Sequence, residues 1–309
     1  MTRVAAIDCG TNSVRLLVAD VEAGTGPLVD LDRRMEIVRL GEGVDHTGVF
    51  AAEALERTFA ACRRFAEIVR ALGAERLRFV ATSASRDVRN RTEFVAGVRA
   101  ALGVDPEVVS GDEEARLSFA GATRELAADG DRSAPFLVVD IGGGSTEIVL
   151  GAHSVDAAVS TDIGCVRMTE RHLHTDPPTE AEIRAATADI DAALDRATEV
   201  VDVTAAHTLV GLAGSVTTVA AMALDLPTYD AARIHLSRIP ATDVHQVASR
   251  LLSMSREQRA ALPFMHPGRV DVIGAGALVL DRVTMRLPQL SDVVVSEHDI
   301  LDGIAWSLA

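Results

Sequence analysis

The sequence contains no lysine, and all 30 of its basic residues are arginines. This absence excludes nucleotide sites of the P-loop type, which place a lysine on the phosphates. It also excludes enzymes that bind a substrate as a Schiff base through a lysine. A phosphate site in this chain would therefore need arginines, together with a metal ion.

Cysteine is scarce as well. Cys9, Cys62 and Cys165 are odd in number and have no C-x-x-C spacing, so neither a disulfide framework nor a zinc site is indicated. Free cysteines and the lack of a basic and apolar leader at the start favour a cytoplasmic protein. The longest mildly apolar stretch, 209–226, is broken by glycines and hydroxyl side chains. It predicts a buried strand and helix, and we expect no membrane partner.

Negative charge dominates, because the chain carries 45 acidic residues and a net charge of −15. Residues 1–125 hold 17 arginines and 20 acids, so most of the excess lies in the remainder. Binding of double-stranded nucleic acid depends on dense positive charge, so no nucleic acid partner is expected. With 309 residues, of which 48% are hydrophobic, the chain suits two globular domains.

One sequence pattern occurs twice. Residues 8–13 (Asp-Cys-Gly-Thr-Asn-Ser) follow the apolar run 4–7, and residues 140–145 (Asp-Ile-Gly-Gly-Gly-Ser) follow the apolar run 136–139. Each copy predicts a buried strand, an aspartate, a glycine turn with a hydroxyl, and a second strand. Two such hairpins, one per half-chain, indicate two related domains that face each other across a phosphate.

These residue types suit phosphate and metal chemistry. Glycines let backbone N–H groups approach an anion, hydroxyls add donors, and carboxylates hold divalent cations. A single copy is equally typical of a plain tight turn, and the repetition is what favours a binding site. The predicted metal ligands are Asp8, Asp140 and Glu147. The residues predicted to surround the phosphates are Thr11, Asn12, Ser13, Gly142, Gly143, Gly144, Ser145 and Thr146.

Both halves have the same order of elements, with three strands followed by alternating helices and strands. In the first half the expected strands are 3–7, 13–20, 28–40, 76–82 and 108–109, and the expected helices are 51–72, one ending at 102, and 110–127. In the second half the expected strands are 136–140, 146–150, 155–161, 207–212 and 292–296, and the expected helices are 165–174, 179–199, 215–224, several within 241–283, and 299–308. The polar stretch 128–133 is the expected linker. We therefore expect an α/β protein with domains 1–128 and 129–309, whose last helix could pack back on the first domain.

Three further segments are candidates for anion binding. Gly214 and Ser215 join a strand to a helix, where free N–H groups suit an anion, although Ser215 could simply cap the helix. Arg86 lies at a helix start, where a basic group opposes the helix dipole and a bound anion would relieve the conflict. Arg167 opens a basic helical stripe that either lines a path for more phosphates or is an exposed face.

The two adjacent glutamates at 113 and 114 have different expected roles. Ser110 and Glu113 have the spacing of a capping box, which accounts for Glu113 without a function. Glu114 has no such local role and shares a semi-apolar helical face with Leu117 and Gly121. If that face lined a cleft, partial burial would raise the pKa of Glu114 toward values useful in a general base.

The segments 8–13, 81–86, 110–115, 140–147 and 211–215, in this order, resemble the exopolyphosphatase and guanosine-pentaphosphate phosphohydrolase (Ppx/GppA) family. The resemblance covers the whole chain in its short, two-domain form, within the actin, sugar-kinase and heat-shock ATPase superfold. It implies two ribonuclease-H-like domains, with mixed sheets flanked by helices and an active-site cleft between them. By position, Glu114 matches the glutamate that activates water and Arg86 a substrate-phosphate arginine. Asp140 and Glu147 match metal-associated acids, and Gly142 and Ser145 match the phosphate loop.

The resemblance implies hydrolysis of the terminal phosphoanhydride of inorganic polyphosphate, with short chains expected. Orthophosphate would be released with Mg²⁺ as the cofactor and Mn²⁺ as its alternative. A second interpretation is a guanosine pentaphosphate 5′-phosphohydrolase, with guanosine tetra- and pentaphosphate as partners. A third is a non-catalytic alarmone- or nucleotide-binding module, which the presence of Glu114 and of all three acids disfavours. Family members often pair, so a homodimer is expected.

Overall fold

The computed structural model describes residues 1–22, 28–86, 88–126 and 133–309. Contacts divide the chain into two compact units: unit 1 is 1–121 with 300–309, and unit 2 is 122–299. The boundary expected between residues 128 and 129 lies outside the described residues, as does the linker expected at 128–133 up to residue 132. Both units are mixed sheets flanked by helices, so the α/β fold class is confirmed.

Unit 1 has a five-stranded sheet in the order β3-β2-β1-β4-β5. Its strands are β1 (Thr2–Cys9), β2 (Ser13–Val21), β3 (Leu28–Ile37), β4 (Arg76–Ala81) and β5 (Glu107–Val108). Its helices are α1 (Val44–Thr47), α2 (Ala52–Leu72), α3 (Ser83–Arg86), α4 (Arg91–Leu102), α5 (Gly111–Thr123) and α13 (Ile300–Trp306). The first three strands form an antiparallel meander, whereas β4 and β5 are parallel to β1.

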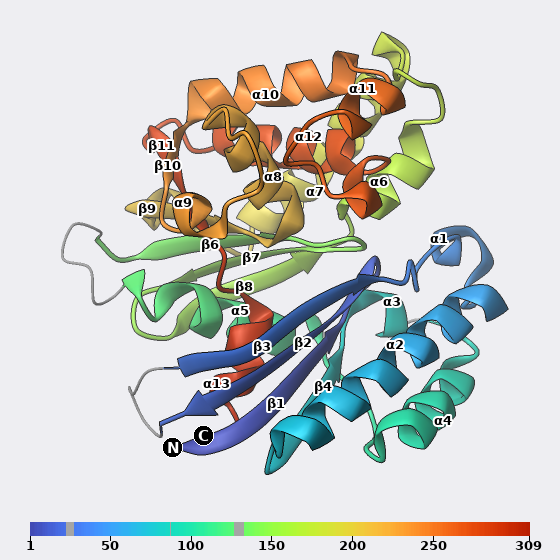
Figure 1. Cartoon of the computed structure of the whole chain (residues 1–309). Helices are drawn as coiled ribbons and strands as arrows, with labels where there is room; N and C mark the ends of the chain where they lie inside the picture. Colours follow the sequence, from blue (N-terminus) through green and yellow to red (C-terminus); the bar gives the residue numbers. More distant parts are fainter. Residues whose placement is uncertain (23–27, 87, 127–132) are drawn as a thin grey trace. The chain divides into compact units, whose positions relative to one another are not determined.

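Both faces of this sheet are covered, which explains why β1 is apolar almost throughout. Ala5 and Ile7 pack into one cluster with α2 and α4, whereas Val4 and Ala6 pack into another with α5 and α13. Figure 1 shows α2 and α4 on one side of these strands and the red α13 on the other. Parallel pairing also brings the carboxyl ends of β1, β4 and β5 to one edge of the sheet.

Unit 2 has a six-stranded sheet in the order β10-β11-β9-β6-β7-β8. Its strands are β6 (Phe136–Ile141), β7 (Thr146–Gly151), β8 (Val155–Thr161), β9 (Thr208–Leu212), β10 (Arg238–Pro240) and β11 (Asp292–Ser296). Its α-helices are α6 (Cys165–His172), α7 (Glu180–Thr198), α8 (Ala213–Ala223), α9 (Ala231–Ile234), α10 (Ala241–Ser253), α11 (Arg256–Ala260) and α12 (Ile273–Met285), with short 3₁₀ turns at Val203–Ala205 and Pro267–Arg269.

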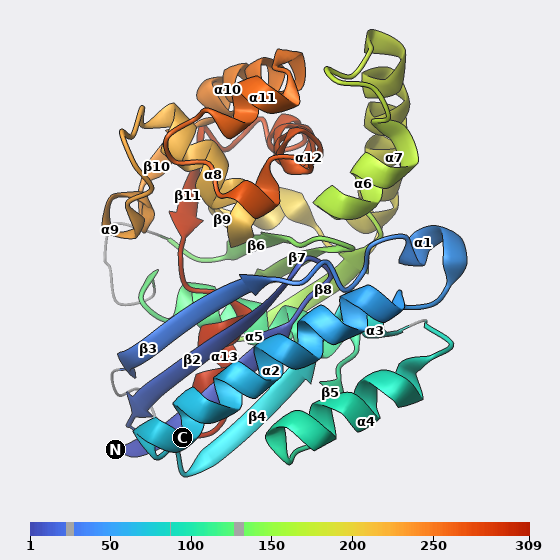
Figure 2. The ribbon, with the colours of Figure 1, turned by 45° about the vertical axis from the view of Figure 1, so that its right-hand side comes forward.

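One large apolar cluster joins β6, β7 and β9 to helices α6, α7, α8, α10 and α12. Figure 2 shows these helices together on one side of the sheet. Most expected elements are present within a few residues, whereas α1, α9 and β10 were not expected, and the helix expected to end at 102 is present as the separate helices α3 and α4. Among the described residues, no helix combines the length and apolar character that a bilayer crossing requires.

Within unit 1, an ion pair links the edge strand β3 to the last helix. Arg33 of β3 contacts the fully buried Asp302 of α13 and also the exposed Asp30.

Asp302→Asn should lower the free energy of unfolding by about 3 kcal/mol, because it leaves Arg33 without its buried countercharge. Asp30→Asn, which removes the exposed partner of the same arginine, should change it by less than about 1 kcal/mol. Urea denaturation of both variants checks this, and equal losses would contradict it.

Candidate functional site

The two repeated segments form the same hairpin. In unit 1 the Gly10 amide donates to the Ser13 carbonyl at 3.0 Å, and in unit 2 the Gly142 amide donates to the Ser145 carbonyl at 3.0 Å. In each, the aspartate is the second residue before the turn glycine. The sequence repeat is therefore a repeat of backbone geometry.

The residue opposite the aspartate differs between the two hairpins. Across β1 and β2, Asp8 pairs with Arg15, whose Nη2 donates to Asp8 Oδ2 at 2.6 Å. Across β6 and β7, Asp140 pairs with Glu147, and both carboxylates are buried. Directly opposite residues of an antiparallel pair share a face of the sheet, and like charges there repel. Unit 1 balances its aspartate with arginine, whereas the acid pair of unit 2 suits a cation.

The Glu147 side chain is held in place by its neighbour on β8. Ser160 Oγ donates to Glu147 Oε1 at 2.7 Å, and Glu147 is only 1% exposed. Carboxylate oxygens are the ligands that Mg²⁺ prefers. Asp140 and Glu147 are therefore a donor set of the right chemistry for that ion.

The glycine loop of unit 2 is fixed by the start of α6. The amides of Cys165 and Val166 donate to the carbonyls of Gly142 and Gly143, and Arg167 Nε donates to the Gly144 carbonyl at 2.7 Å. In a trans peptide the C=O and N–H groups point in opposite directions. The next three amides, those of Gly143, Gly144 and Ser145, are thus directed away from α6, and consecutive amides of this kind bind anions.

The Thr146 hydroxyl, predicted to surround a phosphate, already makes a hydrogen bond within the protein. The side chain is fully buried, and Oγ1 donates to the Ile163 carbonyl at 3.1 Å.

In the basic stripe predicted on α6, Arg171 forms an ion pair with Asp189 at 3.5 Å. Arg167 is the member of that stripe that contacts the glycine loop.

The third glycine segment lies beside the second hairpin, because Leu212 of β9 pairs with Asp140 of β6. The interpretation of Ser215 as a helix cap is wrong, since α8 begins at Ala213 with Leu212 as its N-cap. Ala213 has a φ of +70°, a left-handed conformation that is strained for a residue other than glycine. Such strain is common at ligand sites.

Arg269 is the residue at this segment that the sequence did not single out. A Cβ on Gly214 would lie 2.6 Å from Arg269 Nε, so glycine is needed for the guanidinium to lie there. Arg269 Nη1 also donates to Thr218 Oγ1 at 3.1 Å. The arginine is 55 residues from Gly214, and the only local signal was its place in a His-Pro-Gly-Arg turn.

In unit 1, Glu114 and Arg86 meet at the edge where the parallel strands end. Glu114 is in the first turn of α5, after β5. The prediction that Arg86 lies at a helix start is wrong, because Arg86 is the last residue of α3, which follows β4. Arg86 Nη1 donates to Glu114 Oε2 at 2.6 Å, and the Glu114 side chain is 9% exposed. Burial disfavours the ionised carboxylate, whereas the adjacent guanidinium favours this form, which is the one that can accept a proton.

The capping box explanation for Glu113 is half confirmed. Its amide donates to Ser110 Oγ at 3.2 Å, as expected. Its carboxylate lies 3.5 Å from Arg78 and 3.7 Å from Arg116, and no bond from it back to the Ser110 amide is present among the described residues. Glu113 thus has a local role that Glu114 lacks.

The turn of the first hairpin carries Thr11, Asn12 and Ser13. Thr11 Oγ1 and Ser83 Oγ lie 3.0 Å apart, which links the turn to α3. The Asn12 carbonyl accepts the amides of Val38 and Arg39. One edge of unit 1 therefore carries Asp8, Thr11, Asn12, Ser13, Arg86 and Glu114. One edge of unit 2 carries Asp140, Glu147, the 142–146 loop, Arg167, Gly214 and Ser215.

Two cysteines next to the glycine turns carry no reactive thiolate. Cys9 and Cys165 are buried, and burial raises the pKa of both thiols. They remain protonated at neutral pH and pack as small apolar side chains.

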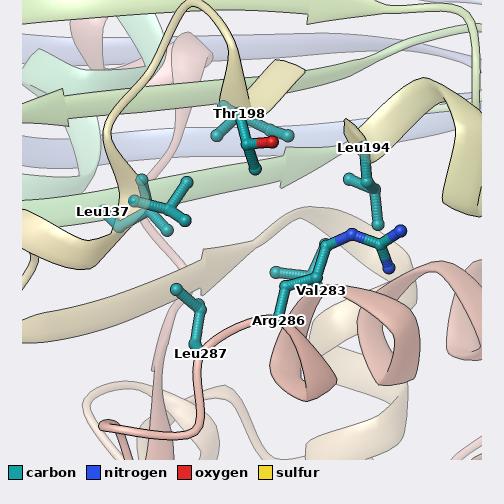
Figure 3. Close-up of a pocket in the computed structure, with 8 residues that line it drawn as sticks. Leu137, Leu194, Thr198, Val283, Arg286 and Leu287 are labelled. Carbon is teal, nitrogen blue, oxygen red and sulfur yellow. The ribbon is translucent and has the colours of Figure 1, made fainter. Parts of the chain in front are cut away.

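A pocket elsewhere in unit 2 contains none of these residues. Figure 3 shows it between β6, α7 and α12, with Leu137, Leu194 and Leu287 among the side chains that line it. Its charged lining residue, Arg286, is engaged by Asp191 and Asp195. The pocket is apolar and has no phosphate chemistry.

Comparisons with known proteins show which family and fold the chain resembles. The profile of the Ppx/GppA phosphatase family matches residues 17–308. Exopolyphosphatase 2 of Mycobacterium tuberculosis is 54% identical over 100% of this chain and 99% of its own length. A crystal structure of an exopolyphosphatase-like protein is 44% identical, with a TM-score of 0.95, over 100% of this chain and 98% of that one. Guanosine-5′-triphosphate,3′-diphosphate pyrophosphatase of Aeromonas salmonicida is 30% identical over 98% of this chain and 59% of its own length.

The contact between α6 and the glycine loop leads to a stability prediction. A Cβ on Gly164 would lie 2.3 Å from the Gly143 carbonyl oxygen, so Gly164→Ala should force the loop from α6 and lower the free energy of unfolding by about 2 kcal/mol. The control is Gly274→Ala, where the nearest atom is the end of the flexible Leu252 side chain at 3.3 Å. Thermal unfolding measures both, and an unchanged midpoint for Gly164→Ala would contradict the close approach.

Proposed function

Because the chain belongs to the Ppx/GppA phosphatase family, we propose that it is an exopolyphosphatase that hydrolyses the terminal phosphoanhydride of short polyphosphate. The full-length similarity to a relative named Exopolyphosphatase 2 supports this activity. The single observation that carries the mechanism is the Arg86–Glu114 pair, a buried carboxylate held by an arginine next to a turn of small polar residues. The carboxylate can take a proton from the attacking water, and the arginine can donate hydrogen bonds to the phosphate.

In this mechanism unit 2 binds the phosphates. The three amides directed away from α6, of Gly143, Gly144 and Ser145, donate to phosphate oxygens. Arg167 keeps the loop in this conformation through its bond to the Gly144 carbonyl. Since the amides are fixed before the substrate arrives, little reorganisation is needed as charge develops on the phosphoryl group.

Unit 1 supplies the base. Glu114 accepts a proton from water, which then attacks the terminal phosphorus in line with the bond to the leaving phosphate. Arg86 holds Glu114 ionised before the substrate binds, and its remaining N–H groups donate to the terminal phosphate. Thr11, Asn12 and Ser13 add donors from the hairpin turn.

The acid pair of unit 2 is the proposed metal site. Asp140 and Glu147 face each other across β6 and β7, and their oxygens suit Mg²⁺, with Mn²⁺ as the alternative. When bound there, the ion would neutralise negative charge on the phosphates. Asp8 is a weaker candidate as a ligand, because Arg15 donates to it at 2.6 Å and 3.0 Å.

Removal of the 5′ phosphate of guanosine pentaphosphate is the second candidate. The relative from Aeromonas salmonicida, whose name describes a guanosine substrate, favours it, and the same base and loop would act. Release of orthophosphate from tripolyphosphate and from guanosine pentaphosphate, compared as kcat/KM, separates the two. A value at least about tenfold higher for the nucleotide would reverse our assignment. No phosphate release from either substrate, with nucleotide bound, would favour the non-catalytic module.

The homodimer and the cytoplasmic location stay predictions from the sequence. The chain carries 45 acidic residues against 30 arginines, a charge balance that gives no support to a nucleic acid partner. Sedimentation velocity of the purified chain would measure the oligomeric state.

Glu114→Gln removes the proposed base while keeping the shape of the side chain. Hydrolysis of tripolyphosphate should fall at least about 100-fold in kcat, because amide groups do not accept the proton of water. Glu113→Gln is the matched control on the same helical turn and should keep at least half of the activity. Orthophosphate release measures both, and near wild-type turnover by folded Glu114→Gln would remove Glu114 from the mechanism.

Glu147→Gln tests the acid pair. Loss of one carboxylate should raise the Mg²⁺ concentration that gives half-maximal activity at least about tenfold, because changes even outside the ligand set cost that much. Asp156→Asn, at an exposed position on β8, is the control and should leave the Mg²⁺ dependence unchanged. Titration of activity with Mg²⁺ reads out both variants. An unchanged half-maximal concentration for Glu147→Gln would place the metal elsewhere.

A further inference from the structure

A second group of metal-ligating side chains lies within unit 2 and contains no residue of the phosphate site. Glu125, His235 and His298 each offer one ligand atom, and these three atoms lie within 4.8 Å of one another. We propose that they bind a divalent transition-metal ion of the zinc class. This inference does not depend on the proposed hydrolase activity.

The distances within the cluster match such an ion. His235 Nε2 lies 2.9 Å from Glu125 Oε2, and His298 Nδ1 lies 3.5 Å from Glu125 Oε1. Zinc binds histidine nitrogen and carboxylate oxygen at about 2.0–2.2 Å, so the ligand atoms of a tetrahedral site lie roughly 3.3 Å apart. The two observed separations bracket that value. Three protein ligands would leave a fourth position for water.

His298 supplies an independent observation. Its Nδ1 is buried, and no hydrogen bond to it is present among the described residues. A buried ring nitrogen without a hydrogen bond is unfavourable unless something else occupies it. The backbone at His298 is fixed, because Ser296 Oγ donates to its carbonyl at 2.7 Å and accepts its amide at 3.1 Å. On this fixed backbone the ring places Nδ1 3.5 Å from Glu125 Oε1.

A metal ion can bind His235 Nε2 only if the proton on that nitrogen moves. The Nδ1 of this ring accepts the Glu297 amide at 3.2 Å, so the neutral ring carries its proton on Nε2, where it donates to Glu125 Oε2. A metal on Nε2 displaces that proton. The proton moves to Nδ1 as the long contact with the Glu297 amide opens, and no net proton is released by the neutral ring.

Ligand chemistry separates this site from the acid pair. Two imidazoles and one carboxylate favour zinc-class ions, whereas two carboxylates favour Mg²⁺. Position along the chain suggests what the ion does. Glu125 lies close to the first residue of unit 2 and His298 next to its last, while His235 lies between α9 and β10. A bound ion would connect the beginning and the end of the unit 2 sequence to the segment between α9 and β10.

Cobalt(II) spectroscopy on the metal-stripped full chain tests the proposal, with excess Mg²⁺ present to occupy carboxylate sites. We expect visible absorption bands of low-symmetry Co²⁺ that saturate at one ion per chain and disappear when Zn²⁺ is added. His298→Ala should weaken binding of Co²⁺ and of Zn²⁺ at least about tenfold. Calorimetric titration with Zn²⁺ measures the same loss.

Two controls make the result decisive. His245→Ala removes an exposed histidine that pairs with Asp281 outside the cluster, and it should bind as the wild type does. Glu147→Gln should also keep its Co²⁺ bands, even though it loses Mg²⁺-dependent activity. His298→Gln, with folding checked by circular dichroism, replaces His298→Ala if the latter does not fold. Wild-type affinity in a folded His298 variant, or loss of the bands in Glu147→Gln alone, would overturn the proposal.

Discussion

Two buried carboxylates of like charge, Asp140 and Glu147, lie opposite each other on neighbouring strands, and the candidate site of unit 2 follows from this constraint. Their repulsion is reduced when a cation lies between them. The glycine loop between the two strands directs consecutive amides away from α6, an arrangement that suits an anion. A cation and a polyanion can thus stabilise each other at the same hairpin.

The duplicated hairpin has diverged in charge. Unit 1 has Arg15 where unit 2 has Glu147, so its aspartate is balanced within the protein. The same edge of unit 1 carries Glu114 and Arg86 on elements that follow parallel strands. One copy of the hairpin therefore suits metal and phosphate binding, and the other lies on the same edge of its sheet as Glu114, the proposed general base.

The sequence predicted what depends on local pattern. Alternating and continuous apolar runs located almost every strand, and the helix expected at 51–72 is present as α2, which ends at Leu72 with Gly73 at a φ of +68° as its C-cap. The pairing of Asp8 with Arg15 was also accessible, because both are equally far from the hairpin turn. The cap at Ser215 was wrong because Ala213 adopts a positive φ and starts the helix two residues earlier, a strain that local preference disfavours.

Contacts between distant segments could not be predicted from one sequence. Arg269 reaches Gly214, and Arg33 reaches Asp302, only because helices pack on sheets in a particular register. The semi-apolar face of Glu114 indicated its burial, but its pairing with Arg86 depends on the order of β4 and β5 in the sheet. Periodicity shows which face of an element is buried and not which element covers it.

We propose that Glu114 is the base in hydrolysis of the terminal phosphate and that Asp140 and Glu147 hold the metal ion that this reaction uses. A crystal structure of the Glu114→Gln variant with Mg²⁺ and tripolyphosphate tests it most directly. We predict electron density for Mg²⁺ against Asp140 and Glu147, phosphate oxygens on the amides of Gly143, Gly144 and Ser145, and the residue 114 side chain facing the terminal phosphorus. Tripolyphosphate bound with residue 114 remote from it, or Mg²⁺ bound away from both acids, would contradict the account.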